Sequence, residues 1–197
     1  FGKSQGGNVW LDAARTSPYK FYQYWLNSAD EDSEKFIRIF TFLTEDEINA
    51  VVAEHNEAKH LRVLQKRLAS EITRMVHSEE ALEKAIKASA ILFGKSTSDD
   101  LKGLDEQTFL DVFEGVPMAD VERAKIADDY DLVAALAGDT GFLKSNSEVT
   151  RALKENSISV NKEKVAQGYA LGADDLINDK FILLQRGKKN YFVLRVV

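Results

Sequence analysis

Cysteine is absent from this 197-residue sequence, which excludes disulfides, zinc–cysteine clusters and thiol catalysis. The three histidines, His55, His60 and His77, lack the HExxH spacing of a zinc protease, so we predict no metal site. The sequence also lacks a run of eighteen or more apolar residues and a secretory signal, so it predicts neither a membrane-spanning helix nor secretion. Together these absences are typical of a protein in a reducing compartment, and we expect the cytoplasm.

The acidic and basic residues are unevenly distributed. The whole chain has a formal net charge of −6, with 26 Lys and Arg against 32 Asp and Glu. Residues 144–197 contain ten Lys and Arg against six Asp and Glu, whereas residues 1–143 contain sixteen against twenty-six. An acidic chain with a basic end favours an anionic partner at that end. The length and a hydrophobic content of 44% allow two small domains.

Residues 17–93 show the periodicity of a helical bundle. Helix-start signals stand at Ser17-Pro18, at Asp30, at the capping-box pair Thr44 and Glu47, near Leu61 and at Ser78. Apolar residues spaced three or four apart predict the packed faces, namely Phe36, Ile37, Phe40 and Leu43, then Leu61, Leu64, Leu68, Ile72, Met75 and Val76, and then Leu82, Ala85, Ile86 and Ile91. Beyond the bundle, the sequence predicts a short helix over 105–113 and a short strand over 121–126.

The stretch from residue 144 to 165 predicts a helix capped by Ser145 or Ser147, a half-buried strand over 158–160 and a polar turn at Asn161-Lys162. A hairpin follows, with strands over 181–185 and 191–196. Basic side chains stand on this helix, on its turn and at the hairpin tip: Lys144, Arg151, Lys154, Lys162, Arg186, Lys188 and Lys189. We interpret them as ligands of an RNA phosphate backbone; the alternative is that they only solvate a surface.

The first seven residues, Phe-Gly-Lys-Ser-Gln-Gly-Gly, are glycine-rich and contain one lysine, Lys3, that can neutralise phosphate charge. By themselves they are typical of a flexible terminus. Together with Asn-Val-Trp-Leu-Asp at 8–12 and Thr-Ser-Pro-Tyr-Lys-Phe-Tyr-Gln-Tyr-Trp-Leu-Asn at 16–27, they closely resemble the bacterial tyrosyl-tRNA synthetases. In that family a KFGKS version of the class I KMSKS loop precedes such a run. Its last four positions correspond here to Phe1, Gly2, Lys3 and Ser4.

The stretches 144–153 and 158–165 resemble the small RNA-binding fold of ribosomal small-subunit protein four, which also occurs at the end of bacterial tyrosyl-tRNA synthetases. The two resemblances imply a mainly α chain in four parts. These are a remnant of the class I catalytic domain (1–16), a helical anticodon-binding domain (17–114), a linker (115–128) and a small α+β RNA-binding domain (129–197).

The resemblance also implies a function. The full-length enzyme would be a homodimeric tyrosine–tRNA ligase that activates tyrosine with ATP and magnesium and transfers it to tRNA(Tyr). Lys3 would contact the ATP phosphates, and Asp30 would accept hydrogen bonds from the anticodon guanine, unless it only caps its helix. Because the chain begins inside the KMSKS-type loop, we expect a C-terminal fragment that binds tRNA and is inactive alone. We expect it to hold neither ATP nor magnesium, and it can be a monomer.

Two other functions are compatible with parts of the sequence. A noncatalytic RNA-binding module of a ribosome-associated factor could use the same terminal fold, but it would not need residues 1–43. A helical scaffold for protein interactions would not respond to RNA at all.

Overall fold

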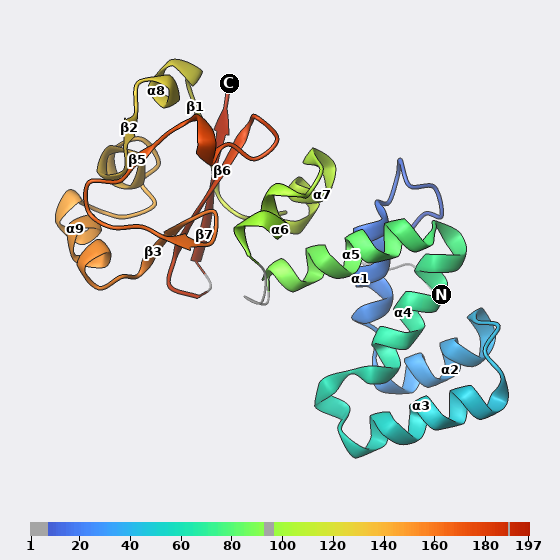
Figure 1. Cartoon of the computed structure of the whole chain (residues 1–197). Coiled ribbons are helices and arrows are strands. Elements are labelled where there is room, and N and C mark those ends of the chain that lie inside the picture. The colour runs from blue at the N-terminus through green and yellow to red at the C-terminus, as the bar shows by residue number, and fades with distance from the viewer. Residues whose placement is uncertain (1–7, 93–96, 189) are drawn as a thin grey trace. The chain divides into compact units, whose positions relative to one another are not determined.

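The computed structural model of the chain describes residues 8–92, 97–188 and 190–197. It divides into two compact units, Phe1–Ser89 and Ala90–Val197. Over the described ranges the first unit contains only helices, whereas the second combines short helices with two sheets (Figure 1). The prediction of a mainly α chain that also contains an α+β part is therefore confirmed at this coarse level. Among the described residues, no helix is long and apolar enough to cross a lipid bilayer.

The helices of the first unit begin where the sequence predicts. They are α1 (Pro18–Leu26), α2 (Asp30–Phe40), α3 (Glu45–Glu57), η1 (Lys59–Leu61), α4 (Val63–Val76) and α5 (Glu79–Leu92), the last of which runs on into the second unit. Ser17 accepts a hydrogen bond from the Lys20 backbone amide, and Pro18 occupies the first turn. At the start of α3, Thr44 and Glu47 form the reciprocal capping box. Local capping chemistry thus sets these boundaries.

The core of the first unit is built around α4, which packs against α1, α2 and α3. Its residues Leu64, Leu68 and Ile72 are 1%, 0% and 3% exposed, as the periodicity predicts. From α1, Trp25 lies edge-on to Phe36 of α2, with ring centroids 5.8 Å apart. The apolar stripes of separate helices thus meet in one core.

Three residues predicted to be packed are instead exposed: Leu61, Met75 and Ile86. Leu61 precedes Arg62, whose left-handed backbone (φ 53°) separates it from the face of α4. Met75 lies in the last turn of α4, at the edge of the buried arc. In α5 the buried positions step by three residues, from 82 to 85, 88 and 91, which turns the packed face away from Ile86.

The second unit is organised by a mixed five-stranded sheet in the order β1-β7-β6-β3-β4, in which β1 runs parallel to β7 and the other pairs are antiparallel. Its strands are β1 (Met118–Val121), β3 (Ile158–Val160), β4 (Glu163–Lys164), β6 (Phe181–Arg186) and β7 (Asn190–Val196). A two-stranded sheet pairs β2 (Tyr130–Asp131) with β5 (Ala170–Leu171). The remaining elements are α6 (Ser98–Lys102), α7 (Glu106–Val112), α8 (Arg123–Ala127), η2 (Ala134–Asp139), α9 (Asn146–Lys154) and η3 (Ala173–Asp175).

The prediction of a strand over residues 121–126 is wrong. The observed strand β1 ends at Val121, and the helix α8 follows from Arg123. Residues 118–121 pair in parallel with 193–196, far away in the sequence. The Arg123 backbone amide then donates to the carbonyl of Val197. The register of this strand therefore depends on a distant partner, which a local pattern does not reveal.

The compact units also differ from the predicted parts of the chain, because α6 and α7 belong to the second unit and not to a helical domain ending at 114. The Phe109 ring of α7 stacks on the Phe181 ring of β6, with centroids 4.9 Å apart. Glu106 pairs with Lys180 at 2.7 Å. Likewise, the stretch 115–128 is not only a linker, since it contains β1 of the main sheet. Apolar contacts with β6 thus attach α7 to the sheet.

Replacement of Leu64, Leu68 or Ile72 by alanine should each lower the free energy of unfolding by about 2–5 kcal/mol, because each replacement leaves a cavity in the core of the first unit. Urea titration followed by circular dichroism would measure it. The control is Met75→Ala on the same helix, which is half exposed and should change stability by less than about 0.5 kcal/mol. Losses as small as the control's at all three core positions would contradict this packing.

Candidate nucleic-acid interface

The helix α9 presents a basic face from a well-fixed position in the second unit. Ser145 caps its N-terminus by accepting from the Glu148 backbone amide at 3.3 Å, and Val149, Ala152 and Leu153 are buried. On the other side Arg151 and Lys154 are exposed and line a shallow hollow with Asn146, Ser147 and Thr150. Cations and hydroxyl or amide donors on one rigid helix suit an anionic backbone.

The turn after β3 is held in a strained conformation by a buried amide. Asn161 and Lys162 both have left-handed backbones, with φ values of 46° and 74°. The Asn161 side chain accepts from the Leu183 backbone amide at 2.9 Å and donates to the Asp175 carbonyl at 2.6 Å. Asparagine tolerates this backbone region better than most residues, and here its buried side chain also fixes the turn.

The side chain of Lys162 makes contacts inside the second unit. Its ammonium group donates to the Ile91 carbonyl at 2.9 Å and to the Tyr191 hydroxyl at 3.0 Å. It also lies 4.6 Å from the centre of the Tyr191 ring, a cation–π distance. Its positive charge remains at this surface, but the side chain has a structural role that the sequence did not indicate.

Arg186 is also partnered. Its guanidinium lies 2.5 Å from Glu148 Oε1, while Glu148 Oε2 accepts from the Lys144 backbone amide at 2.9 Å. The Lys144 amide, and after it Arg186, hold the pKa of Glu148 below its ordinary value. Arg186 is thereby joined to the first turn of α9, and part of its charge is balanced.

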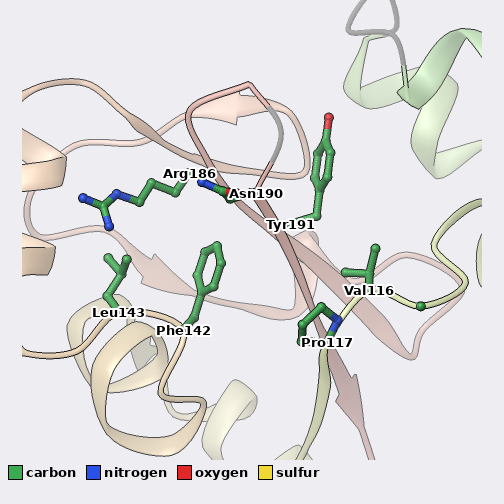
Figure 2. A pocket seen from close by; sticks show the side chains of 8 residues that line it. Val116, Pro117, Phe142, Leu143, Arg186, Asn190 and Tyr191 are labelled. Atoms are coloured by element: carbon green, nitrogen blue, oxygen red, sulfur yellow. The ribbon is translucent and has the colours of Figure 1, made fainter.

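A cavity of about 450 Å³ lies beside this pair (Figure 2). It is lined by Gly115, Val116, Pro117, Phe142, Leu143, Arg186, Asn190 and Tyr191. In Figure 2, Arg186 and Leu143 lie on one side, Val116 and Pro117 lie on the other, and Phe142 stands between them. The sequence does not indicate this cavity, because no local pattern shows that the hairpin faces the segment before α9.

The outcomes for the seven predicted RNA ligands therefore differ. Lys144, Arg151, Lys154 and Lys188 are exposed, whereas Lys162 and Arg186 are partly buried and partnered. Lys189 lies outside the described residues, and so do Phe1, Gly2, Lys3 and Ser4 of the KMSKS-type motif. Among the residues that the structure describes, no group of three or more His, Asp or Glu side chains is placed to hold a metal ion.

Asp30 lies in the first unit, on a well-supported corner. It is the first residue of α2 and follows Ala29, which cannot cap the helix with its side chain. Arg62 donates to the carbonyls of Leu26 at 2.7 Å and Ser28 at 3.1 Å, and so fixes the chain that leads into α2. No local sequence pattern indicates this role of Arg62.

Side chains from α3 and α4 contact the carboxylate of Asp30. Gln65 Nε2 donates to Oδ1 at 2.5 Å, and His55 Nε2 lies 3.2 Å from the same oxygen. The Gln65 hydrogen bond, with smaller effects of His55 and Lys59, holds the pKa of Asp30 below its ordinary value. The side chain is nevertheless 42% exposed. An ionised carboxylate therefore faces solvent in a fixed position.

Comparisons with known proteins match both units. The family model "tRNA synthetases class I (W and Y)" matches residues 1–94, and the model "Tyrosine--tRNA ligase SYY-like C-terminal domain" matches residues 108–194. The tyrosine–tRNA ligase of Flavobacterium johnsoniae is 62% identical over 197 residues, which are all of this chain and 46% of that protein. The enzyme of the same name from Porphyromonas gingivalis is 54% identical over 197 residues, again all of this chain and 46% of that protein.

A solved structure, the C-terminally truncated mitochondrial tyrosyl-tRNA synthetase of Aspergillus nidulans, is 30% identical, with a TM-score of 0.42. The similarity covers 43% of this chain and 25% of that one. The chain spans about half the length of the curated relatives it matches.

Replacement of Lys162 by methionine should lower the free energy of unfolding by about 0.5–1.5 kcal/mol for each of its two hydrogen bonds, since the apolar stem remains but the ammonium donor is lost. Chemical denaturation of the 197-residue chain would measure the change. Lys154→Met is the matched control, because Lys154 is exposed on α9, and it should alter stability by less than about 0.5 kcal/mol. Equal effects of the two changes would show that the contacts of Lys162 contribute no stability.

Proposed function

Because this chain belongs to the tyrosine–tRNA ligase family, we propose that it is the part of such a ligase that binds tRNA(Tyr). The observation that carries the proposal is the exposed basic face of α9 within the region that matches the family's C-terminal domain. The second unit would then be an RNA-binding fold like that of ribosomal small-subunit protein four. The first unit would be the helical anticodon-binding domain.

In this proposal the second unit binds phosphates. Of the seven predicted ligands, four are exposed and have no side-chain partner among the described residues, so they can approach an RNA backbone: Lys144, Arg151, Lys154 and Lys188. Lys162 and Arg186 would add to the local potential, but their side chains are held by Tyr191 and Glu148. Phosphate contacts position the RNA and carry no sequence information directly.

Sequence information would come from the first unit, through Asp30. An ionised carboxylate accepts hydrogen bonds and donates none. It therefore selects a base edge that carries donors, and the Watson–Crick edge of guanine offers N–H groups from its ring and its amino group. The fixed and half-exposed carboxylate of Asp30 has the chemistry and the access that this contact needs.

The ligase reaction is assigned to the complete protein, since the relatives are about twice as long as the matched region. That protein would activate tyrosine with ATP and magnesium in the cytoplasm, and it would act as a homodimer. Lys3 would meet the ATP phosphates there, where a cation stabilises the charge that develops on the departing pyrophosphate. The alternative, a ribosome-associated RNA-binding factor, is not favoured, because the class I synthetase model matches residues 1–94.

The first test is the salt dependence of tRNA(Tyr) binding. If about four phosphates are contacted, log affinity should fall with log salt at a slope of roughly −3 to −4, and Arg151→Ala or Lys188→Ala should each flatten the slope by about one. Filter binding or fluorescence anisotropy from about 50 mM salt upwards would measure it.

The control for this test is Arg195→Ala, because the Arg195 guanidinium is already bound to both oxygens of Asp120. It should leave the slope nearly unchanged. No measurable affinity for tRNA(Tyr) at about 50 mM salt, or equal slopes for all three variants, would mean that the basic face is only a solvated surface.

The second test concerns Asp30. Asp30→Asn should reduce the preference for guanine over adenine at the anticodon base by about 1–3 kcal/mol, because an amide can turn a donor toward the base. Binding of the chain to the two tRNA(Tyr) transcripts would measure the preference, and thermal unfolding would check the fold. An equal loss of affinity for both transcripts would show that Asp30 does not read this base.

A further inference from the structure

Two polar side chains lie in the apolar core of the first unit, directly beneath Asp30. Gln65 on α4 is 0% exposed, and His55 on α3 is 2% exposed. Leu64, Leu68 and Ala69, the neighbours of Gln65 on α4, are all buried apolar residues. A position with these neighbours would ordinarily hold another aliphatic side chain.

Both side chains are incompletely satisfied. Among the described residues, Gln65 Oε1 and His55 Nδ1 have no hydrogen-bond partner. His55 Nε2 lies 3.2 Å from Asp30 Oδ1, but without the alignment of a well-formed hydrogen bond. A buried polar atom without a partner destabilises a fold, so stability does not explain the choice of these residues. Their shared feature is that both are directed at the same oxygen of Asp30.

The two oxygens of the Asp30 carboxylate have different surroundings. Oδ1 receives the Gln65 amide at 2.5 Å and lies beside His55, while no partner of Oδ2 is found in the part of the chain that the structure describes. A carboxylate that is held through one oxygen keeps its plane and presents the other oxygen in a fixed direction. Holding a binding group in its productive orientation before the ligand arrives reduces the entropy lost on binding.

We propose that Gln65, supported by His55, is a positioning residue that fixes the Asp30 carboxylate so that Oδ2 faces the anticodon base. This inference rests on the proposed function of Asp30 and extends it into the core. Arg62 fixes the backbone that leads into α2 and so places Asp30. The two buried side chains hold the carboxylate of Asp30. Gln65 itself does not contact RNA, and it acts only through Asp30.

A double-mutant cycle between Gln65 and Asp30 tests the proposal. Gln65→Met keeps the length of the side chain and removes the amide donor. In the 197-residue chain it should lower the preference for the guanine transcript of tRNA(Tyr) over the adenine transcript about 3- to 10-fold, the effect of losing one hydrogen bond. In the Asp30→Asn background the same change should have no further effect on this preference, because the group that Gln65 positions has been altered.

The matched control is Thr73→Val. Thr73 lies on the same helix, is 0% exposed, and its hydroxyl has no partner among the described residues. Replacing it removes a buried polar group from α4 at a distance of eight residues from Gln65, and should leave the preference between transcripts unchanged. An equal loss for Thr73→Val and Gln65→Met would overturn the proposal, because it would trace the effect to the helix and not to Asp30.

A second measurement distinguishes the loss of positioning from a general loss of stability. Carbon-detected NMR titration of the Asp30 carboxyl should show that its pKa moves up toward the ordinary value in Gln65→Met and stays low in Thr73→Val. An unchanged pKa together with an unchanged preference would overturn the proposal. If Asp30→Asn itself leaves the preference intact, the proposed function of Asp30 fails; if Asp30→Asn lowers it but Gln65→Met does not, only the positioning role fails.

Discussion

The strand β6 is buried on both faces, and each face requires its own apolar cover. Ile182 and Leu184 contribute to the core that includes residues of η2 and α9, whereas Phe181 on the opposite face stacks on Phe109 of α7. Its backbone pairs with β7 over residues 181–186 and, on the other side, with β3 over residues 184–186. This single strand therefore determines where α7, α9 and the hairpin lie within the second unit.

The placement of α9 and of the hairpin has an electrostatic consequence. The same packing that brings the hairpin to the first turn of α9 pairs Arg186 with Glu148, and it brings Lys162 to Tyr191. Part of the positive charge that the sequence predicts at the RNA interface is thus paired with groups inside the fold. Arg151 and Lys154 on α9 remain exposed, as do Lys144 before the helix and Lys188 on the hairpin, so the proposed interface is centred on that helix.

In the first unit, a buried group that lowers stability supports the proposed function. Leu64, Leu68 and Ile72 make α4 the centre of its core, while Gln65 places an amide among them. A buried amide with an unsatisfied oxygen costs stability, which the neighbouring apolar contacts must offset. The benefit is a carboxylate at the surface whose direction is set by buried groups and not by flexible surface contacts.

The sequence by itself determined the local features of this protein. Helix starts at Ser17 and Thr44, the core face of α4, and the hairpin of β6 and β7 follow from capping groups and from apolar periodicity, which act over a few residues. Only the tertiary structure decided that residues 118–121 form a strand beside β7, that Phe109 joins the sheet, and that Gln65 and His55 meet Asp30. Each of these contacts joins residues 25 to 75 positions apart, and no periodic pattern specifies which distant surfaces will pack together.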